Sequence, residues 1–172
     1  MTPQRLAQSS AYQEVVRGLL RLHRYTVEKQ DETPEYDETC AAMEGHWGQL
    51  TAAEIERLGG LSKDLYTVSD PPGTQPPETM NSQAQGKLGE AYEARERGEW
   101  DRALELLRRL GKLVPAPLLS YLRARIWEDI GDEAVAAIFF DHARRLDPTN
   151  ENFRADQHIP ASAEANGAAS DL

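Results

Sequence analysis

Apolar side chains recur every three or four residues along most of the chain, a spacing that places them on one face of a helix. The pattern predicts helices over residues 4–29, 34–47 and 51–58, with one further helical turn over 61–68. The first helix carries the longest apolar stripe, formed by Tyr12, Val15, Val16, Leu19, Leu22 and Val27. Ala, Leu, Glu and Arg dominate the composition, so we expect an all-α fold.

Local capping signals predict where these helices begin and end. Thr33-Pro34-Glu35 indicates a helix start, because threonine offers an N-cap oxygen, proline suits the first helical position and glutamate meets the positive end of the dipole. Thr51 and Glu54 have the spacing of a capping box, which predicts the start of the third helix. Gly59-Gly60 predicts the end of that helix.

A proline-rich stretch divides the chain into two helical units. Pro71, Pro72, Pro76 and Pro77 cannot continue a helix, so residues 69–86 are predicted to be a linker. It separates an N-terminal helical unit (residues 1–68) from a second unit (residues 87–150). Residues 151–172 lose the periodicity and are rich in small and polar residues, which predicts a disordered tail.

Within the second unit, a pattern of four residues repeats after 33 positions. Gly98, Ala103, Leu107 and Pro115 recur as Gly131, Ala136, Phe140 and Pro148. A repeat of this period, with small residues at helix contacts and a proline closing each unit, is typical of stacked helical hairpins. The register predicts that Ala136 is buried at a close helix contact.

The two repeats, which together span residues 87–148, resemble tetratricopeptide repeats (TPRs), a family of helical hairpins that stack into an α-solenoid. The second repeat carries the resemblance through Gly131-Asp132, Ala136, Phe140, Ala143 and Leu146-Asp147-Pro148. The first repeat contains the signature Leu88-Gly89-x-x-Tyr92, although this signature lies two residues too far upstream of Gly98. Either the first helix is extended or Ala91 and Ala94 are the true contact positions, and the second alternative is favoured.

A fainter resemblance links residues 33–68 to helical segments of uncharacterised bacterial repeat proteins, and it implies no activity. It is carried by Thr33-Pro34-Glu35, His46-Trp47 and the run from Leu61 to Tyr66.

The TPR resemblance implies that the first helix of each hairpin lines a concave face that binds a peptide or protein. The residues expected on that face are Tyr92, Arg95, Tyr121, Arg125 and Glu128. Tyr and Arg are favoured anchors at interfaces. A basic, Tyr-lined strip would select an acidic segment or a C-terminal carboxylate, including the chain's own end at Asp171-Leu172. Alternatively, these residues pack against the N-terminal helices or the tail.

Two repeats fall below the three or so expected for independent stability, so both ends of the pair need a cover. The long N-terminal helix is the first candidate to cover one of the ends, and self-association is the alternative. The expected function is therefore a scaffold or adaptor that binds a protein or peptide partner. The alternative function is a self-associating structural protein, a homo-oligomer whose repeat ends pair.

The composition of the chain argues against several classes of partner and indicates where the protein is located. The net charge of −10 disfavours nucleic acid and anionic membranes as partners. No apolar run approaches the roughly 20 residues of a membrane span, no signal-peptide core precedes the first helix, and a single cysteine permits no internal disulfide. We therefore expect a soluble, cytoplasmic protein.

Catalytic chemistry has weak support in the sequence. Carboxylates cluster over residues 31–38, but acidic residues belong in the first turn of a helix. His23, Cys40 and His46 lack the close spacing of metal ligands, and Cys40 has the helical phase of a buried apolar residue. There is no phosphate loop or nucleophile elbow. We expect no enzymatic activity, no metal and no cofactor.

Overall fold

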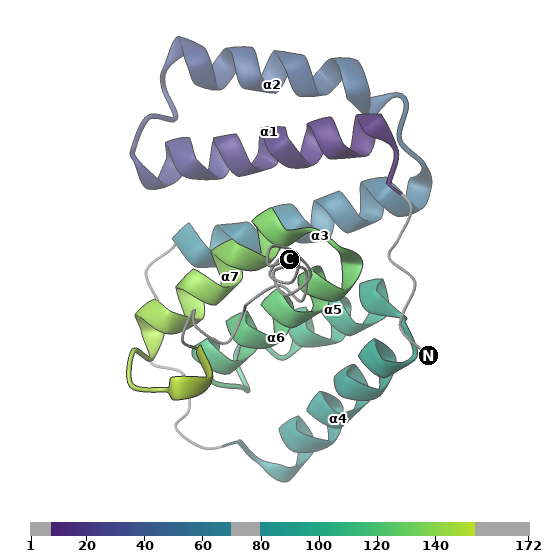
Figure 1. Cartoon of the computed structure of the whole chain (residues 1–172), viewed down its shortest axis with the longest axis vertical. Helices are drawn as coiled ribbons and strands as arrows, with labels where there is room; N and C mark the ends of the chain where they lie inside the picture. The colour runs from purple at the N-terminus through teal and green to yellow at the C-terminus, as the bar shows by residue number, and fades with distance from the viewer. Residues whose placement is uncertain (1–7, 70–79, 154–172) are drawn as a thin grey trace, which may run out of the picture.

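The computed structural model describes residues 8–69 and 80–153, and within these ranges the chain is all-helical with no strand. The prediction of an all-α fold is confirmed. The prolines of residues 71–77 and most of the expected tail lie outside the described residues. The helices are α1 (Ser10–Val27), α2 (Pro34–Trp47), α3 (Ala52–Ser69), α4 (Ser82–Glu96), α5 (Trp100–Arg109), α6 (Ala116–Ile130), α7 (Glu133–Leu146) and the short 3-10 helix η1 (Glu151–Phe153) (Figure 1).

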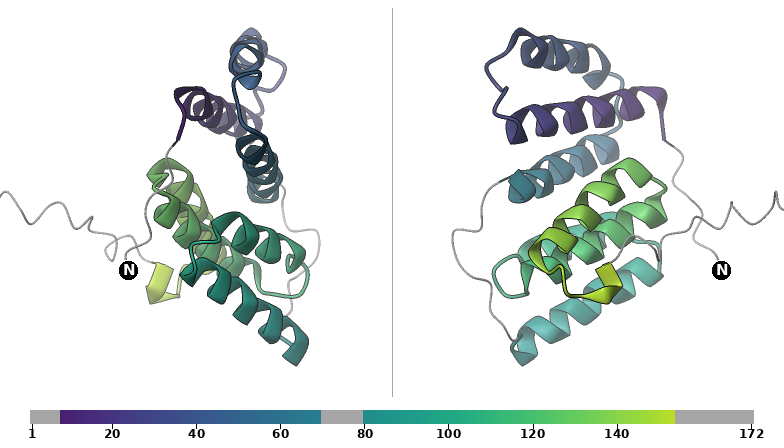
Figure 2. Two further views of the ribbon diagram at one scale, coloured as in Figure 1. Left: turned by 90° about the vertical axis from the view of Figure 1, so that its right-hand side faces the viewer. Right: turned by 60° about the vertical axis from the view of Figure 1, so that its left-hand side comes forward.

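The helices stack along the long axis of the molecule, with α2 at one end and α4 at the other (Figure 1, Figure 2). α1 and α2 form an antiparallel hairpin, and α1 packs on α3. α3 packs against α5, so α3 covers the repeat unit in the place expected for the first helix. The outer side of α4 is polar and exposed, which removes the need for a cover at that end. Its exposed residues opposite the buried stripe include Glu93 and Glu96.

The capping box that begins α3 is present. The Glu54 backbone N–H donates to Thr51 Oγ1 at 3.2 Å, and the Thr51 N–H donates to Glu54 Oε2 at 2.9 Å. The Ser9 hydroxyl also donates to Glu54 at 2.9 Å, which ties the start of α1 to the start of α3. The hydrogen bond from the Thr51 N–H is the main cause that lowers the pKa of Glu54. By contrast, Thr33 occupies the N-cap of α2 but its hydroxyl donates to the Gln30 carbonyl instead of capping.

Gly59-Gly60 does not end the third helix, contrary to the sequence prediction. α3 continues to Ser69, because its buried face runs through the glycines as Leu58, Leu61 and Leu65. That burial outweighs the low helix propensity of glycine. A Cβ at position 60 would lie 2.5 Å from Arg108 Nη2, so Gly60 leaves room for the Arg108 guanidinium.

The two predicted hairpins are α4–α5 and α6–α7. Gly98 and Gly131, which hold the same place in the two repeats, have φ values of 75° and 96°. This left-handed conformation strains other residues and explains the repeated glycine at each turn. The small residues predicted at helix contacts are buried, namely Ala103, Ala124, Ala136 and Ala143. Ala91 and Ala94 are buried as well, which supports the favoured register for the first repeat.

Two boundaries of the repeat unit differ from the prediction. α4 begins at Ser82, within the predicted linker, because the Asn81 side chain caps it by accepting from the Ala84 N–H at 2.8 Å. At the other end, the predicted tail starts with η1, whose Phe153 is buried against the repeat. Among the described helices, none is long and apolar enough to cross a membrane.

Candidate partner-binding face

The five predicted face residues all lie on α4 and α6, the first helices of the two hairpins. α4 buries one stripe, Ala84, Leu88, Ala91 and Ala94, and Tyr92 and Arg95 flank it. α6 is buried on most sides, and its half-exposed positions include Tyr121, Arg125 and Glu128, spaced by four and three residues. Tyr121 lies near enough to Tyr92, and Glu128 near enough to Arg95, to raise the pKa of Tyr92 and of Arg95 through charge–charge interaction. The five residues therefore form one surface, which we call the α4–α6 face.

Arg95 is held by Asp129 of α6 in a two-point ion pair. Its Nε lies 2.5 Å from Oδ2 and its Nη2 lies 3.2 Å from Oδ1. Both side chains are 23% exposed, and the hydrogen bonds to Asp129 raise the pKa of Arg95. The contact joins α4 to α6 and sets the orientation of the guanidinium. The sequence prediction missed Asp129, although its separation of 34 residues from Arg95 is close to one repeat.

Arg125 is also paired with a carboxylate, one turn along α6. Its Nη1 lies 3.3 Å from Glu128 Oε2, and both side chains are about one-third exposed. The face therefore holds two arginines balanced by Glu128 and Asp129, and it is not the basic strip that the sequence suggested. Both arginines have their partners on α6, so they are not held under the N-terminal helices.

The two tyrosines differ in their surroundings. Tyr121 packs between Phe140 of α7 and Phe153 of η1, with ring centroids at 5.9 Å and 5.1 Å. Tyr92 is 42% exposed, and partial burial together with Tyr121 raises its pKa. Phe153 thus packs against one tyrosine of the face, and Tyr92 stays available for contact.

The space under the face is nearly filled. A cavity of about 10 Å³ lies between α4, α5 and α6, lined by Ala91, Tyr92, Arg95, Leu107, Leu122 and Ile126. A volume this small holds at most one water molecule. The face therefore offers a surface of side chains and not an enclosed pocket.

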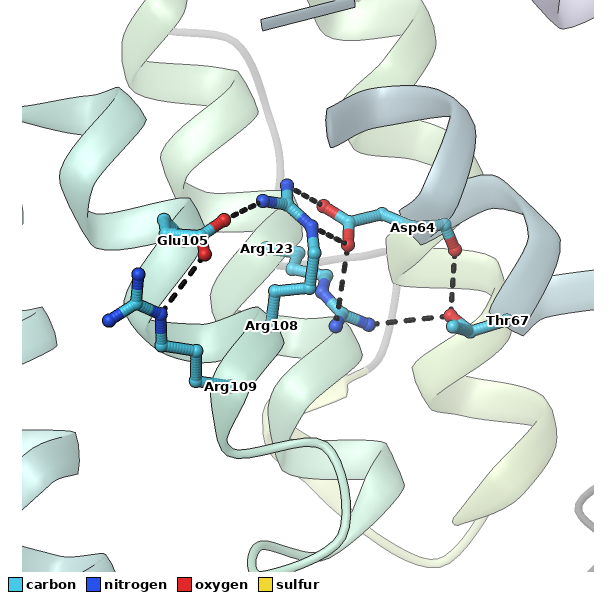
Figure 3. Close-up of polar contacts among 6 residues, drawn as sticks. All are labelled: Asp64, Thr67, Glu105, Arg108, Arg109 and Arg123. Carbon is cyan, nitrogen blue, oxygen red and sulfur yellow. Dashed lines mark hydrogen bonds and ion pairs between the residues drawn. The ribbon is translucent and has the colours of Figure 1, made fainter. Parts of the chain in front are cut away.

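A second group of polar residues joins α3 to the repeat unit. Asp64 of α3 is fully buried and accepts from Arg108 Nε and Nη2, each at 3.0 Å. Nη2 of Arg123, on α6, lies 3.5 Å from Oδ1 of the same carboxylate, and Nη1 of Arg123 donates to Thr67 Oγ1 at 3.4 Å. Figure 3 shows these side chains converging from three helices. We call the group the Asp64 cluster, with members Asp64, Thr67, Glu105, Arg108, Arg109 and Arg123.

The Asp64 cluster extends outward from the buried Arg123 to the surface. Arg108 also pairs with Glu105, which accepts from Arg109 Nε at 3.0 Å. Arg123 is only 4% exposed, and burial lowers its pKa. Three arginines thus share two carboxylates, and Asp64 is the innermost acid. An aspartate inside a stripe of buried leucines was a signal for this cluster, but apolar spacing alone does not identify the arginines that meet it.

The residues considered for catalysis or metal binding are spread over the N-terminal helices. The carboxylates of residues 31–38 are exposed around the start of α2. Cys40 is half-buried, where burial was predicted. In the described parts of the chain, no three His, Cys, Asp or Glu side chains form a group able to hold a metal ion.

The resemblance to TPRs stays a prediction from the 33-residue repeat in the sequence. No protein-family model, curated protein or solved structure matches this chain.

Proposed function

We propose that the protein is a non-catalytic interaction module, a scaffold or adaptor, whose α4–α6 face binds a peptide or protein segment. The observation that carries the proposal is the exposure of Tyr92 beside a guanidinium held in place by Asp129. Exposed tyrosine and ordered arginine are the side chains that contribute most at protein interfaces. The filled space below the face favours a polypeptide partner over a small molecule.

Pre-organisation supports the same assignment. Arg95 and Asp129 join α4 to α6, and Phe153 and Phe140 pack around Tyr121. Side chains already held in place lose little conformational entropy when a partner binds. Arg95 uses its Nε and Nη2 on Asp129, so a partner's carboxylate can still accept from Nη1. An acidic segment therefore remains the proposed partner, bound through tyrosine contacts with charge in a secondary role.

Replacing Tyr92 with Ala is expected to weaken partner binding at least about fivefold, because the partner loses the exposed part of the aromatic ring as a contact surface. The measurement captures partners from a lysate of the source organism on immobilised protein, then titrates the purified partner against wild-type and Tyr92→Ala protein. Tyr66→Ala is the matched control, since Tyr66 of α3 is 68% exposed and lies outside the face. Equal affinity for wild-type and Tyr92→Ala protein would contradict the proposal.

The alternative, self-association through the repeat ends, predicts a different result. Sedimentation equilibrium of the chain alone would give a multiple of the 19.2 kDa monomer mass. The polar outer side of α4 gives that alternative less support than the exposed tyrosine gives a separate partner.

A further inference from the structure

A groove lies between the C-terminal halves of α1 and α7, and its lining includes no residue of the α4–α6 face. Its volume is about 790 Å³. Its α1 wall includes Leu20, Arg24 and Val27, and its α7 wall includes Ile138 and Arg145. We call it the α1–α7 groove. Since the groove and the α4–α6 face share no residue, a role for the groove does not depend on the function proposed for that face.

The groove presents aliphatic side chains from both walls. Val27 is 52% exposed, and Leu20 and Ile138 lie half-buried at the edge of the core. Val27, at the end of α1, keeps about half of its surface in water, so a partner could bury more of it than folding does. Aliphatic side chains grouped at a concave surface are typical of sites that contact another protein.

Charge is distributed unevenly around these side chains. Arg24 and Arg145 are exposed on opposite walls, and within the described residues neither has a carboxylate at ion-pair distance. Arg144, in contrast, is already paired with Asp141. Glu28 is the remaining carboxylate of the lining, so three arginines face two acids in a chain whose net charge is −10. Burial and the nearby Arg145 lower the pKa of His23, which disfavours a positive charge on this side chain.

We propose that the α1–α7 groove binds an amphipathic α-helix of a partner protein, with a ridge of Leu, Ile or Val flanked by Asp or Glu. The apolar ridge would lie on Leu20, Val27 and Ile138, as helices do in grooves formed by two other helices. The acidic flanks would meet Arg24 on one wall and Arg145 on the other. In the part of the chain that the structure describes, each wall carries one arginine that is not paired with a carboxylate. A basic helix would therefore bind poorly, because like charges brought together at an interface are unfavourable.

The test selects helices from a display library with the full chain as bait. Each library member is a helix of about 18 residues, or about five turns, with a constant Leu/Ile ridge and flanks randomised among Glu, Lys and Gln. Wild-type protein is expected to enrich Glu-flanked over Lys-flanked helices at least about tenfold. Ile138→Asp places a carboxylate in the groove and is expected to abolish enrichment, and circular dichroism checks that it stays folded.

A charge reversal makes the test independent of any loss of folding. The double variant Arg24→Glu, Arg145→Glu is expected to reverse the selection and enrich Lys-flanked helices. Arg17→Glu is the matched control, since Arg17 is 60% exposed on α1 outside the groove, and Tyr92→Ala tests the other face. Both should select as wild-type protein does. Failure to enrich any helix, enrichment that survives Ile138→Asp, or unchanged selection by the double variant would overturn the proposal. A dimer that Ile138→Asp dissociates would also overturn it, because the occupant would be a second copy.

Discussion

Replacing Asp64 with Ala is expected to lower the free energy of unfolding by about 3–5 kcal/mol, the cost of removing one partner from a buried ion pair. Asp64 is fully buried and lies at ion-pair distance from both Arg108 and Arg123. Without it, Arg123 keeps its charge in a site that is 4% exposed, with Thr67 as its remaining hydrogen-bond partner. Urea unfolding followed by circular dichroism measures the change.

A carboxylate in an exposed ion pair provides the control for Asp64. Glu14 pairs with Arg17 on the surface of α1, where the two side chains are 45% and 60% exposed. Glu14→Ala is expected to change the unfolding free energy by less than about 0.5 kcal/mol, since solvent screens such pairs. Similar effects of the two substitutions would mean that the Asp64 cluster does not hold α3 on the repeat unit.

Replacing Ala136 with Leu is expected to destabilise the protein by about 1–3 kcal/mol, because a larger side chain does not fit a close helix contact. Ala136 is 3% exposed on α7, the helix that packs most closely against α6. The neighbouring Ala137 is exposed, which makes Ala137→Leu a control with the same change of residue type. That control should stay within about 0.5 kcal/mol of wild type. If denaturant unfolding gave equal effects for both, the repeat register would be wrong.

The parts of the fold that could be predicted from the sequence are those determined by residues close together in the chain. Thr51 and Glu54 form their capping box through neighbours three residues apart, and Gly131 is required by the backbone of a single turn. The prediction at Gly60 was wrong because the reason for that glycine is tertiary. It makes room for Arg108, on a helix that follows much later in the chain. Likewise, nothing local to Phe153 indicates that it packs against Tyr121.

The candidate face was predicted in position but not in charge. The repeat register placed Tyr92, Arg95 and Tyr121 on the first helices of the hairpins, and the structure brings them together. The pairing of Arg95 with Asp129 depends on how α4 sits against α6, which the spacing of apolar residues does not determine. A surface predicted to be basic is therefore balanced in charge, and its tyrosines become the more informative residues.

Site-specific photo-crosslinking tests the proposed binding face most directly. A benzophenone amino acid replaces Tyr92 in the full chain, and a second protein carries it at Tyr66, which is also exposed but lies on α3. After irradiation in a lysate of the source organism, we expect a discrete partner adduct from position 92 and none from position 66. Identical adduct patterns from the two positions, or no adduct from position 92, would contradict a partner bound at the α4–α6 face.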